Sequence, residues 1–421
     1  MARFAPDETP QSVLSDVGRV DWAHLWHLRG AATNVPALLA ELASGTSRDE
    51  RRHALRTLGG IVLPFYDGID GAVCEVTSYV VPFVARLAAA NAPDASDLLA
   101  LLRRIAVIAW DRPPLAPRPG PRVAAAIWSR ATAQLLSRPG PPRPPEHAVA
   151  RFAAMATGAA GALMRHFDPV GAEAAYGHRT HEALVASLPR VFRLLDHDDA
   201  EVRSEAARLL ERLAQSACRP ADLALRIVGH LEDQRDEAVV AHLVLALGHI
   251  GDRHARPVLD ALQGAVDPLV RILAAVGTPG HEDALGDASA RLDVLVGALV
   301  APASLAERYE RATGRPMTAD VIHALLEKRG DAALAQKLLA AIRGTRDPSS
   351  AKPLLDVVLE LVFDDRPPGS APLAGATLSR DQQFVLARLY EGPSDPELHA
   401  RLVAKGLPVD GRTLLAMTRL N

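Results

Sequence analysis

Residues 182–215 read EALVASLPRVFRLLDHDDAEVRSEAARLLERLAQ, and residues 224–251 read ALRIVGHLEDQRDEAVVAHLVLALGHIG. Each stretch predicts two short amphipathic helices joined by an acidic turn, because apolar residues recur at helical spacing on both sides of the turn. The two stretches match at an offset of 37 residues, the separation of Asp199 and Asp236. The other matched positions are Val202, Ala206, Leu209 and Leu210, which fall on Val239, Leu243, Ala246 and Leu247. A repeat of this length predicts a solenoid of stacked helix pairs.

The composition favours an all-α fold. Hydrophobic residues make up 48% of the 421 residues but aromatic residues only 4%, so the apolar surface consists mainly of Ala, Leu and Val. Ala and Leu favour helices, and the alternating β-branched runs that build sheets are scarce. We therefore expect an all-α superhelix with a Pro-rich insertion and a small C-terminal helical cap.

Two proline-rich stretches, 112–122 and 138–145, interrupt the helical pattern. Proline removes a backbone donor, so neither stretch can be helical inside. The expected organisation has four parts. They are N-terminal helical pairs over 1–111, a Pro-rich spacer enclosing one helix over 112–146, the repeat array over 147–364, and a loop with a C-terminal cap over 365–421.

The charge balance gives no reason to expect a polyanionic partner, because 47 basic and 50 acidic residues give a net charge of −3. Cys74 and Cys218 are isolated, which is typical of reduced thiols. The first twelve residues lack the apolar run of a secretory signal, and the longest near-apolar stretch is too short to span a bilayer. We expect a cytoplasmic protein that binds another protein, with nucleic acid disfavoured as a partner and no membrane contact.

The repeats resemble HEAT repeats, on the strength of DHDDAEVRSEAARLL at 196–210 and DPLVRILAAV at 267–276. In HEAT repeats the turn Asp and an Arg that follows a Val often form a ladder between neighbouring repeats. Asp199 with Arg203, and Asp267 with Arg271, fit this pattern. Val240 takes the Arg position in the second copy, so the resemblance implies an interrupted ladder there.

More of the chain resembles a group of bacterial HEAT-repeat proteins. The matching pieces are WAHLWHLRGAATNVPALLAEL at 22–42, EVTSYVVPFVARL at 75–87, ALVASLPRVFRLLDHDDAEVR at 183–203 and LSRDQQFVLARL at 378–389. The resemblance implies an α-solenoid, and it supplies no catalytic residues.

Four polar residues are candidates for a binding face. His242 and His249 are seven apart and share one face of the second helix of their repeat, where they match Glu205 and Arg212 at the repeat offset. In HEAT repeats this second helix usually lines the concave side. The row is either a solvated polar face or a ridge that binds a partner.

Trp22 and Trp26 are candidates near the N-terminus. They are four apart, so we expect them to share one helix face. They are either buried anchors that seal the first repeat or an exposed binding hot spot.

No catalytic residue, metal ligand or cofactor site is predicted. His181-Glu182 and His281-Glu282 are too few, and too differently placed, for the repeated His-Glu pairs of a di-iron HEAT-like hydroxylase. The sequence contains no G-x-S-x-G motif and no P-loop.

These observations favour a non-enzymatic protein–protein interaction scaffold, or a regulatory or immunity-type binding protein. Two alternatives stay open. One is a HEAT-like DNA-binding protein or DNA glycosylase-type enzyme, whose local hint is Trp110 and Trp128 with Arg103, Arg104 and Arg112. The other is a metal- or small-molecule-binding enzyme on a HEAT scaffold.

Overall fold

The computed structural model describes the following residues: 8–27, 30–45, 47–63, 73–90, 92–111, 169–216, 219–278, 288–326, 337–341, 357–359, 363, 382, 385, 402–403 and 405–407. Within them the fold is all-α apart from one two-stranded ribbon, as the composition predicts. Among these residues, no helix combines the length and the apolar character that crossing a membrane requires. The chain divides into two compact units, Met1–Ala246 and Leu247–Asn421. The predicted spacer over 112–146 lies wholly outside the described residues, as does most of the predicted cap.

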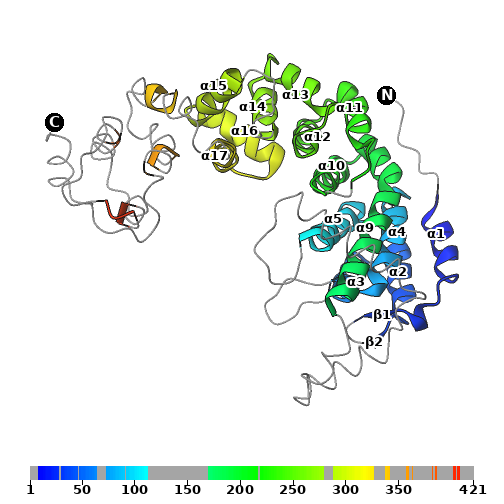
Figure 1. Ribbon diagram of the computed structural model, residues 1–421. Coiled ribbons are helices and arrows are strands. Elements are labelled where there is room, and N and C mark those ends of the chain that lie inside the picture. Colours follow the sequence, from blue (N-terminus) through cyan, green and yellow to red (C-terminus); the bar gives the residue numbers. More distant parts are fainter. Residues whose placement is uncertain are drawn as a thin grey trace. The chain divides into compact units, whose positions relative to one another are not determined.

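The first unit contains the elements up to α11 and the part of α12 that ends at Ala246 (Figure 1). In chain order these are α1 (Pro10–Val17), the 3₁₀ helix η1 (Trp22–His24), β1 (Trp26–His27), β2 (Gly30–Ala31), α2 (Val35–Ser44), α3 (Arg48–Val62), α4 (Glu75–Ala89), α5 (Ala95–Asp111), α9 (Pro169–Arg193), the 3₁₀ helix η2 (Leu194–Asp196), α10 (Ala200–Ala214), α11 (Leu223–Asp233) and α12 (Glu237–Ile250). The antiparallel ribbon pairs Trp26 with Ala31 and His27 with Gly30.

Local signals explain the helix boundaries. Ser47 and Glu50 form a reciprocal capping box that starts α3, with both backbone–side-chain distances at 3.1 Å. The Asp199 carboxylate caps α10 by accepting the Glu201 amide at 2.8 Å. Each cap lies at the junction between two helices that follow one another in the chain, α2 and α3 or α9 and α10.

The helix pairs on the two sides of residues 112–168 pack directly on each other. Helix α4 lies along α9, and α5 lies along α10. Helix α5 buries Leu98, Leu102 and Ile105 at i, i+4 and i+7, so one continuous apolar face enters this interface. Each such side chain stabilises the fold by about 1.5–3 kcal/mol. The helices that flank the predicted spacer therefore belong to one compact unit.

The middle of helix α12, residues 241–248, is buried around its whole circumference. Every residue from Ala241 to Gly248 is buried, whereas an ordinary surface helix exposes one polar side. The unusual content of this stretch, AHLVLALG, accounts for that burial because His242 is its only polar side chain.

The second unit is built around α14. Its described helices are α13 (Ala255–Gln263), α14 (Pro268–Gly277), α15 (Ala288–Leu299), α16 (Ala303–Thr313) and α17 (Met317–Leu326). Helix α14 packs against the other four. Gly248 must be glycine, because a Cβ there would lie 2.1 Å from the Gly277 carbonyl oxygen.

Asp267, at the start of α14, binds an arginine from a later helix. Its two carboxylate oxygens accept hydrogen bonds from Arg308 of α16, at 3.0 and 2.6 Å. Burial raises the pKa of Asp267, but the hydrogen bonds from Arg308 and from the Leu269 amide lower it more, so the pKa falls below 3.8. The predicted ladder aspartate is thus an ionised anchor, and Arg308 holds it.

Candidate functional site

Two arginine clamps join the turns of neighbouring helix pairs in the first unit. Arg51 donates from Nε to Asp94 Oδ2 at 2.7 Å, and Arg203 donates from Nη2 to Asp236 Oδ2 at 2.6 Å. Each arginine is the fourth residue of its helix, and each also donates to a carbonyl oxygen of the turn before that helix. Each aspartate immediately precedes the second helix of the next pair, α5 or α12. A ladder contact of the predicted kind is therefore present between Arg203 and Asp236.

Helices α5 and α10 run in the same direction. Arg103 donates from Nε to Glu205 Oε2 at 3.1 Å, and Arg212 donates from Nη2 to the Val107 carbonyl oxygen at 3.5 Å. Residue numbers rise together along both helices, so the helices are parallel. The second helices α3, α5, α10 and α12 are thus linked one to the next, by the clamps and by these contacts (Figure 1).

A buried polar network connects α5, α10 and α12. Glu205 accepts from Arg103 and, at 2.7 Å, from Arg208 Nη1. Arg208 Nε donates to His242 Nε2 at 3.2 Å, and His242 Nδ1 lies 2.6 Å from Glu211 Oε2. Because Nε2 accepts a hydrogen bond, the imidazole proton is on Nδ1 and is donated to Glu211. The network fixes the relative register of the three helices.

Two of the four predicted row residues are therefore not on a solvated face. Glu205 and His242 are 8% and 2% exposed, because the outer side of this repeat meets neighbouring helices. Arg212 is half-buried, and its guanidinium bonds Gln215 and Val107. His249 is exposed and belongs to the second unit. The expectation of one exposed row was wrong for Glu205 and His242, and the binding role of the four residues stays a prediction.

Trp22 is a buried anchor. It is 5% exposed, its Nε1 donates to the Val17 carbonyl oxygen at 2.8 Å, and its ring lies 5.9 Å from that of Phe83. The expected shared helix face with Trp26 was wrong, because Trp22 opens a 3₁₀ turn and Trp26 starts strand β1. The Trp26 side chain lies outside the described residues.

Arginines occupy the same place on three parallel second helices. Arg56, Arg103 and Arg208 are each the ninth residue of α3, α5 and α10. Arg104 and Arg212 extend this set, and we call the five residues the arginine row. Arg56 and Arg104 are exposed, and the side chains of Arg103 and Arg208 keep 36% and 33% of their surface.

The carboxylates beside the arginine row lie beneath it. Glu205 and Glu211 keep only 10% and 8% of their side-chain surface. Arg104 makes no hydrogen bond or ion pair within the described part of the chain. The outer surface at this level of the helices is therefore positive, although the network below it is nearly neutral.

An acidic row borders the arginine row. Asp49, Asp97 and Glu201 lie in the first turns of α3, α5 and α10, where the helix dipole favours a negative charge. Seven residues separate each acid from an arginine of the same helix, which is about 10 Å. The outer face of the three helices thus carries two parallel rows of opposite charge.

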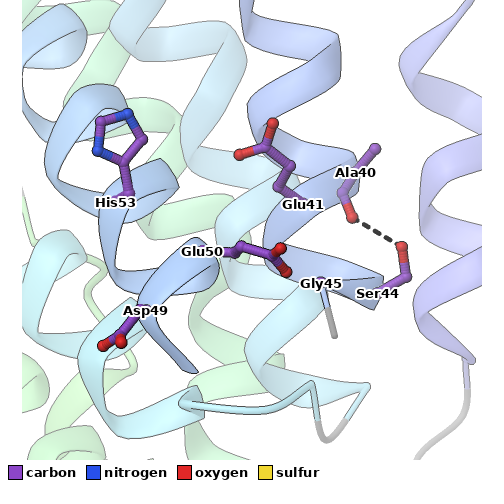
Figure 2. A pocket seen from close by; sticks show the side chains of 7 residues that line it. All are labelled: Ala40, Glu41, Ser44, Gly45, Asp49, Glu50 and His53. Carbon is purple, nitrogen blue, oxygen red and sulfur yellow. Dashed lines mark hydrogen bonds between the residues drawn. The ribbon is translucent and has the colours of Figure 1, made fainter. Parts of the chain in front are cut away.

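The depression between α2 and α3 is at the acidic end of this face. Figure 2 shows Glu41, Asp49, Glu50 and His53 around it, while Ser44 donates its hydroxyl to the Ala40 carbonyl oxygen at 2.9 Å. Glu50 belongs to the capping box of α3. Among the described residues, no group of three or more His, Cys, Asp or Glu side chains is placed to hold a metal ion.

The predicted His-Glu motif at 181–182 is divided between two environments. His181 is buried and its Nε2 lies 3.3 Å from the Ser216 hydroxyl, whereas Glu182 pairs with His178 on the exposed side of α9. His281, Glu282, Arg112 and Trp128 lie outside the described residues, as does the side chain of Trp110.

Comparisons with known proteins assign no family to this chain. No family model and no curated protein matches the chain. Among solved structures, the chain is similar to the crystal structure of an engineered protein, at 17% identity with 89% of this chain and 82% of that chain covered. The TM-score of that match is 0.23, which is too low to carry an argument.

Proposed function

We propose that the helix pairs form a HEAT-type α-solenoid and that the protein acts as a non-enzymatic scaffold, or as a regulatory or immunity-type protein, which binds another protein. The observation that carries the proposal is the chain of linked second helices in the first unit. Arrays of this kind present an extended surface, since each helix pair contacts only its neighbours.

The outer residues of the second helices are the proposed contact surface. Ala100 and Ser204 lie on the outer sides of α5 and α10, where they keep partial exposure. They separate the acidic row from the arginine row. A partner bound along the second helices would cover both residues.

A steric test decides whether this surface binds a protein. The full chain, immobilised as wild type and as Ala100→Trp/Ser204→Trp, is exposed to a lysate of the source cells. The matched control is Leu225→Trp. Leu225 is 53% exposed and lies on α11, which is the first helix of its pair and so lies off the proposed contact surface, in the same unit. We expect one protein to be retained by the wild type and the control, to co-elute with the purified chain at a fixed ratio, and to be lost by the double variant. Retention by all three proteins, or no protein at a fixed ratio, would contradict the proposal.

A further inference from the structure

The arginine row has the chemistry of a carboxylate-binding surface. Glu205 orients the guanidinium groups of Arg103 and Arg208 from below, at 3.1 and 2.7 Å. Arg103 uses Nε in this contact, and its two terminal nitrogens make no hydrogen bond to Glu205. A guanidinium fork held in this way is suited to bidentate binding of a carboxylate.

The acidic row favours a narrow acidic chain over a DNA duplex as the ligand of the arginine row. Asp49, Asp97 and Glu201 lie about 10 Å from the arginines on the same helices. The major groove of a DNA duplex alone is about 12 Å wide, so the whole duplex is wider than the separation of about 10 Å between the two rows. A duplex resting on the arginine row would therefore also cover the acidic row. A narrower chain with carboxylates on one side can contact the arginines alone.

The spacing of the row defines the pattern of those carboxylates. Neighbouring packed helices are about 8–10 Å apart, so the backbone positions of the row on successive helices are separated by about that distance. The side chains of Arg103 and Arg208 converge on Glu205 between α5 and α10. A polyproline-II segment has three residues per turn and rises about 3.1 Å per residue. Every third side chain therefore points the same way, at intervals of about 9 Å.

From the charge and the spacing, we infer that the arginine row binds an extended acidic segment of a partner protein, with a carboxylate at every third residue. This inference rests on the proposed function and specifies its partner. The segment crosses α3, α5 and α10 and places successive carboxylates on Arg56, on Arg103 and Arg104, and on Arg208 and Arg212.

Fluorescence anisotropy with a defined probe tests the inference. The probe is a labelled peptide of Glu-Pro-Pro repeats over about twelve residues, and the comparison peptide has the same composition with its glutamates consecutive. We expect the wild-type chain to bind the spaced peptide more tightly than the block peptide, with affinity that falls as salt rises.

Charge reversal locates the binding. Arg56→Glu/Arg104→Glu is expected to weaken binding of the spaced peptide about tenfold, and Arg56→Gln/Arg104→Gln by a smaller factor. Both residues are exposed, so the fold should persist, which circular dichroism checks. The matched control is Arg235→Glu, an exposed arginine in the turn before α12 whose guanidinium donates to the backbone carbonyl oxygens of Glu232 and Gln234. It should leave the affinity within about twofold.

Three outcomes would overturn the inference. They are no binding of the spaced peptide, equal affinity of the wild type and the Arg56/Arg104 reversal, and tighter binding of a duplex oligonucleotide than of the peptide. A partner retained in the steric test but unaffected by charge reversal would leave the proposed function standing and remove only the acidic segment.

Discussion

Helices α10 and α12 occupy matching places in two consecutive repeats, yet they face different surroundings. The ninth residue is the half-exposed Arg208 in α10 and the buried Leu245 in α12. The fifth residue is Ser204 in α10 and the fully buried Ala241 in α12. The inner faces of the two helices share one apolar pattern, whereas only α10 keeps a polar outer face. The arginine row therefore extends over α3, α5 and α10 and stops at α12.

The largest expected difference between the two helices is in their response to a charge at the fifth position. Ala241→Asp should destabilise the fold by about 3 kcal/mol or more, because it buries a carboxylate at a site with no exposed surface. Ser204→Asp, at the matching position, should change the free energy of unfolding by less than about 1 kcal/mol. Urea denaturation of both variants measures the difference. Similar costs would show that α10 and α12 are equally covered.

The matched pair Glu205 and His242 gives the next largest effect. His242→Leu removes a hydrogen-bonding partner of the buried Glu211 carboxylate and should cost about 3 kcal/mol. Glu205→Gln should cost only about 1 kcal/mol, because the two arginines that it holds reach solvent. A double variant, His242→Leu/Glu211→Leu, should recover part of the loss in the same denaturation experiment. An additive double variant would contradict the coupling of these two side chains.

Arg203 and Val240 are the fourth residues of α10 and α12, and their substitutions are expected to differ in cost. Arg203→Ala should cost about 2 kcal/mol, because it removes hydrogen bonds to Asp236 and to its own turn. Val240→Ala should cost less than about 1 kcal/mol, since Val240 is only partly buried. Thermal unfolding monitored by circular dichroism ranks the two variants. The reverse ranking would contradict a stabilising role of the Arg203–Asp236 clamp between the helix pairs.

The smallest expected effect is pH-dependent. His197 Nδ1 accepts the Asp199 amide at 3.0 Å, and the matching Gln234 accepts the Asp236 amide at 3.0 Å through its side-chain oxygen. Burial lowers the pKa of His197 below 6.5. Below pH 6.5 the unfolded chain therefore binds more protons at this residue than the folded chain, so stability falls as pH falls towards the folded pKa.

His197→Gln copies the α12 turn into the α10 turn and removes the titrating group. We expect the variant to lose less stability than the wild type between pH 7.5 and about pH 5.5. Urea midpoints at the two pH values measure this. An equally steep loss in both proteins would assign the pH dependence to other groups.

The sequence predicts the inner faces of the helices better than their outer faces. Apolar periodicity identified Val202, Leu209, Val239 and Leu243, and all four are buried. The same periodicity placed Glu205 and His242 beside the core, but it carries no information on which neighbouring helix covers them. The burial of α12 depends on contacts outside its repeat, and so a register taken from two repeats could not predict it.

The arginine row was missed although the sequence contains a signal for it. Arg51 and Arg56 stand in α3 as Arg203 and Arg208 stand in α10, at the fourth and ninth helical positions. Both pairs share an offset of 152 residues, since 203 − 51 and 208 − 56 are both 152. So long an offset becomes visible only when the helix starts are known, because residues 112–168 separate the two copies. The failed helix prediction around Trp22 has a different cause. The i,i+4 spacing of Trp22 and Trp26 fits a helix, but Trp26 pairs with Ala31 in an antiparallel ribbon, so it is in a strand and not in a helix.

Arginine-selective dicarbonyl labelling followed by mass spectrometry tests most directly whether the arginine row is a binding surface. The full chain is labelled alone and with the saturating Glu-Pro-Pro peptide. The account predicts that Arg56 and Arg104 react readily in the free protein and are protected by the peptide, while Arg235 reacts equally in both. Protection of Arg235 with no protection of Arg56 and Arg104 would contradict it.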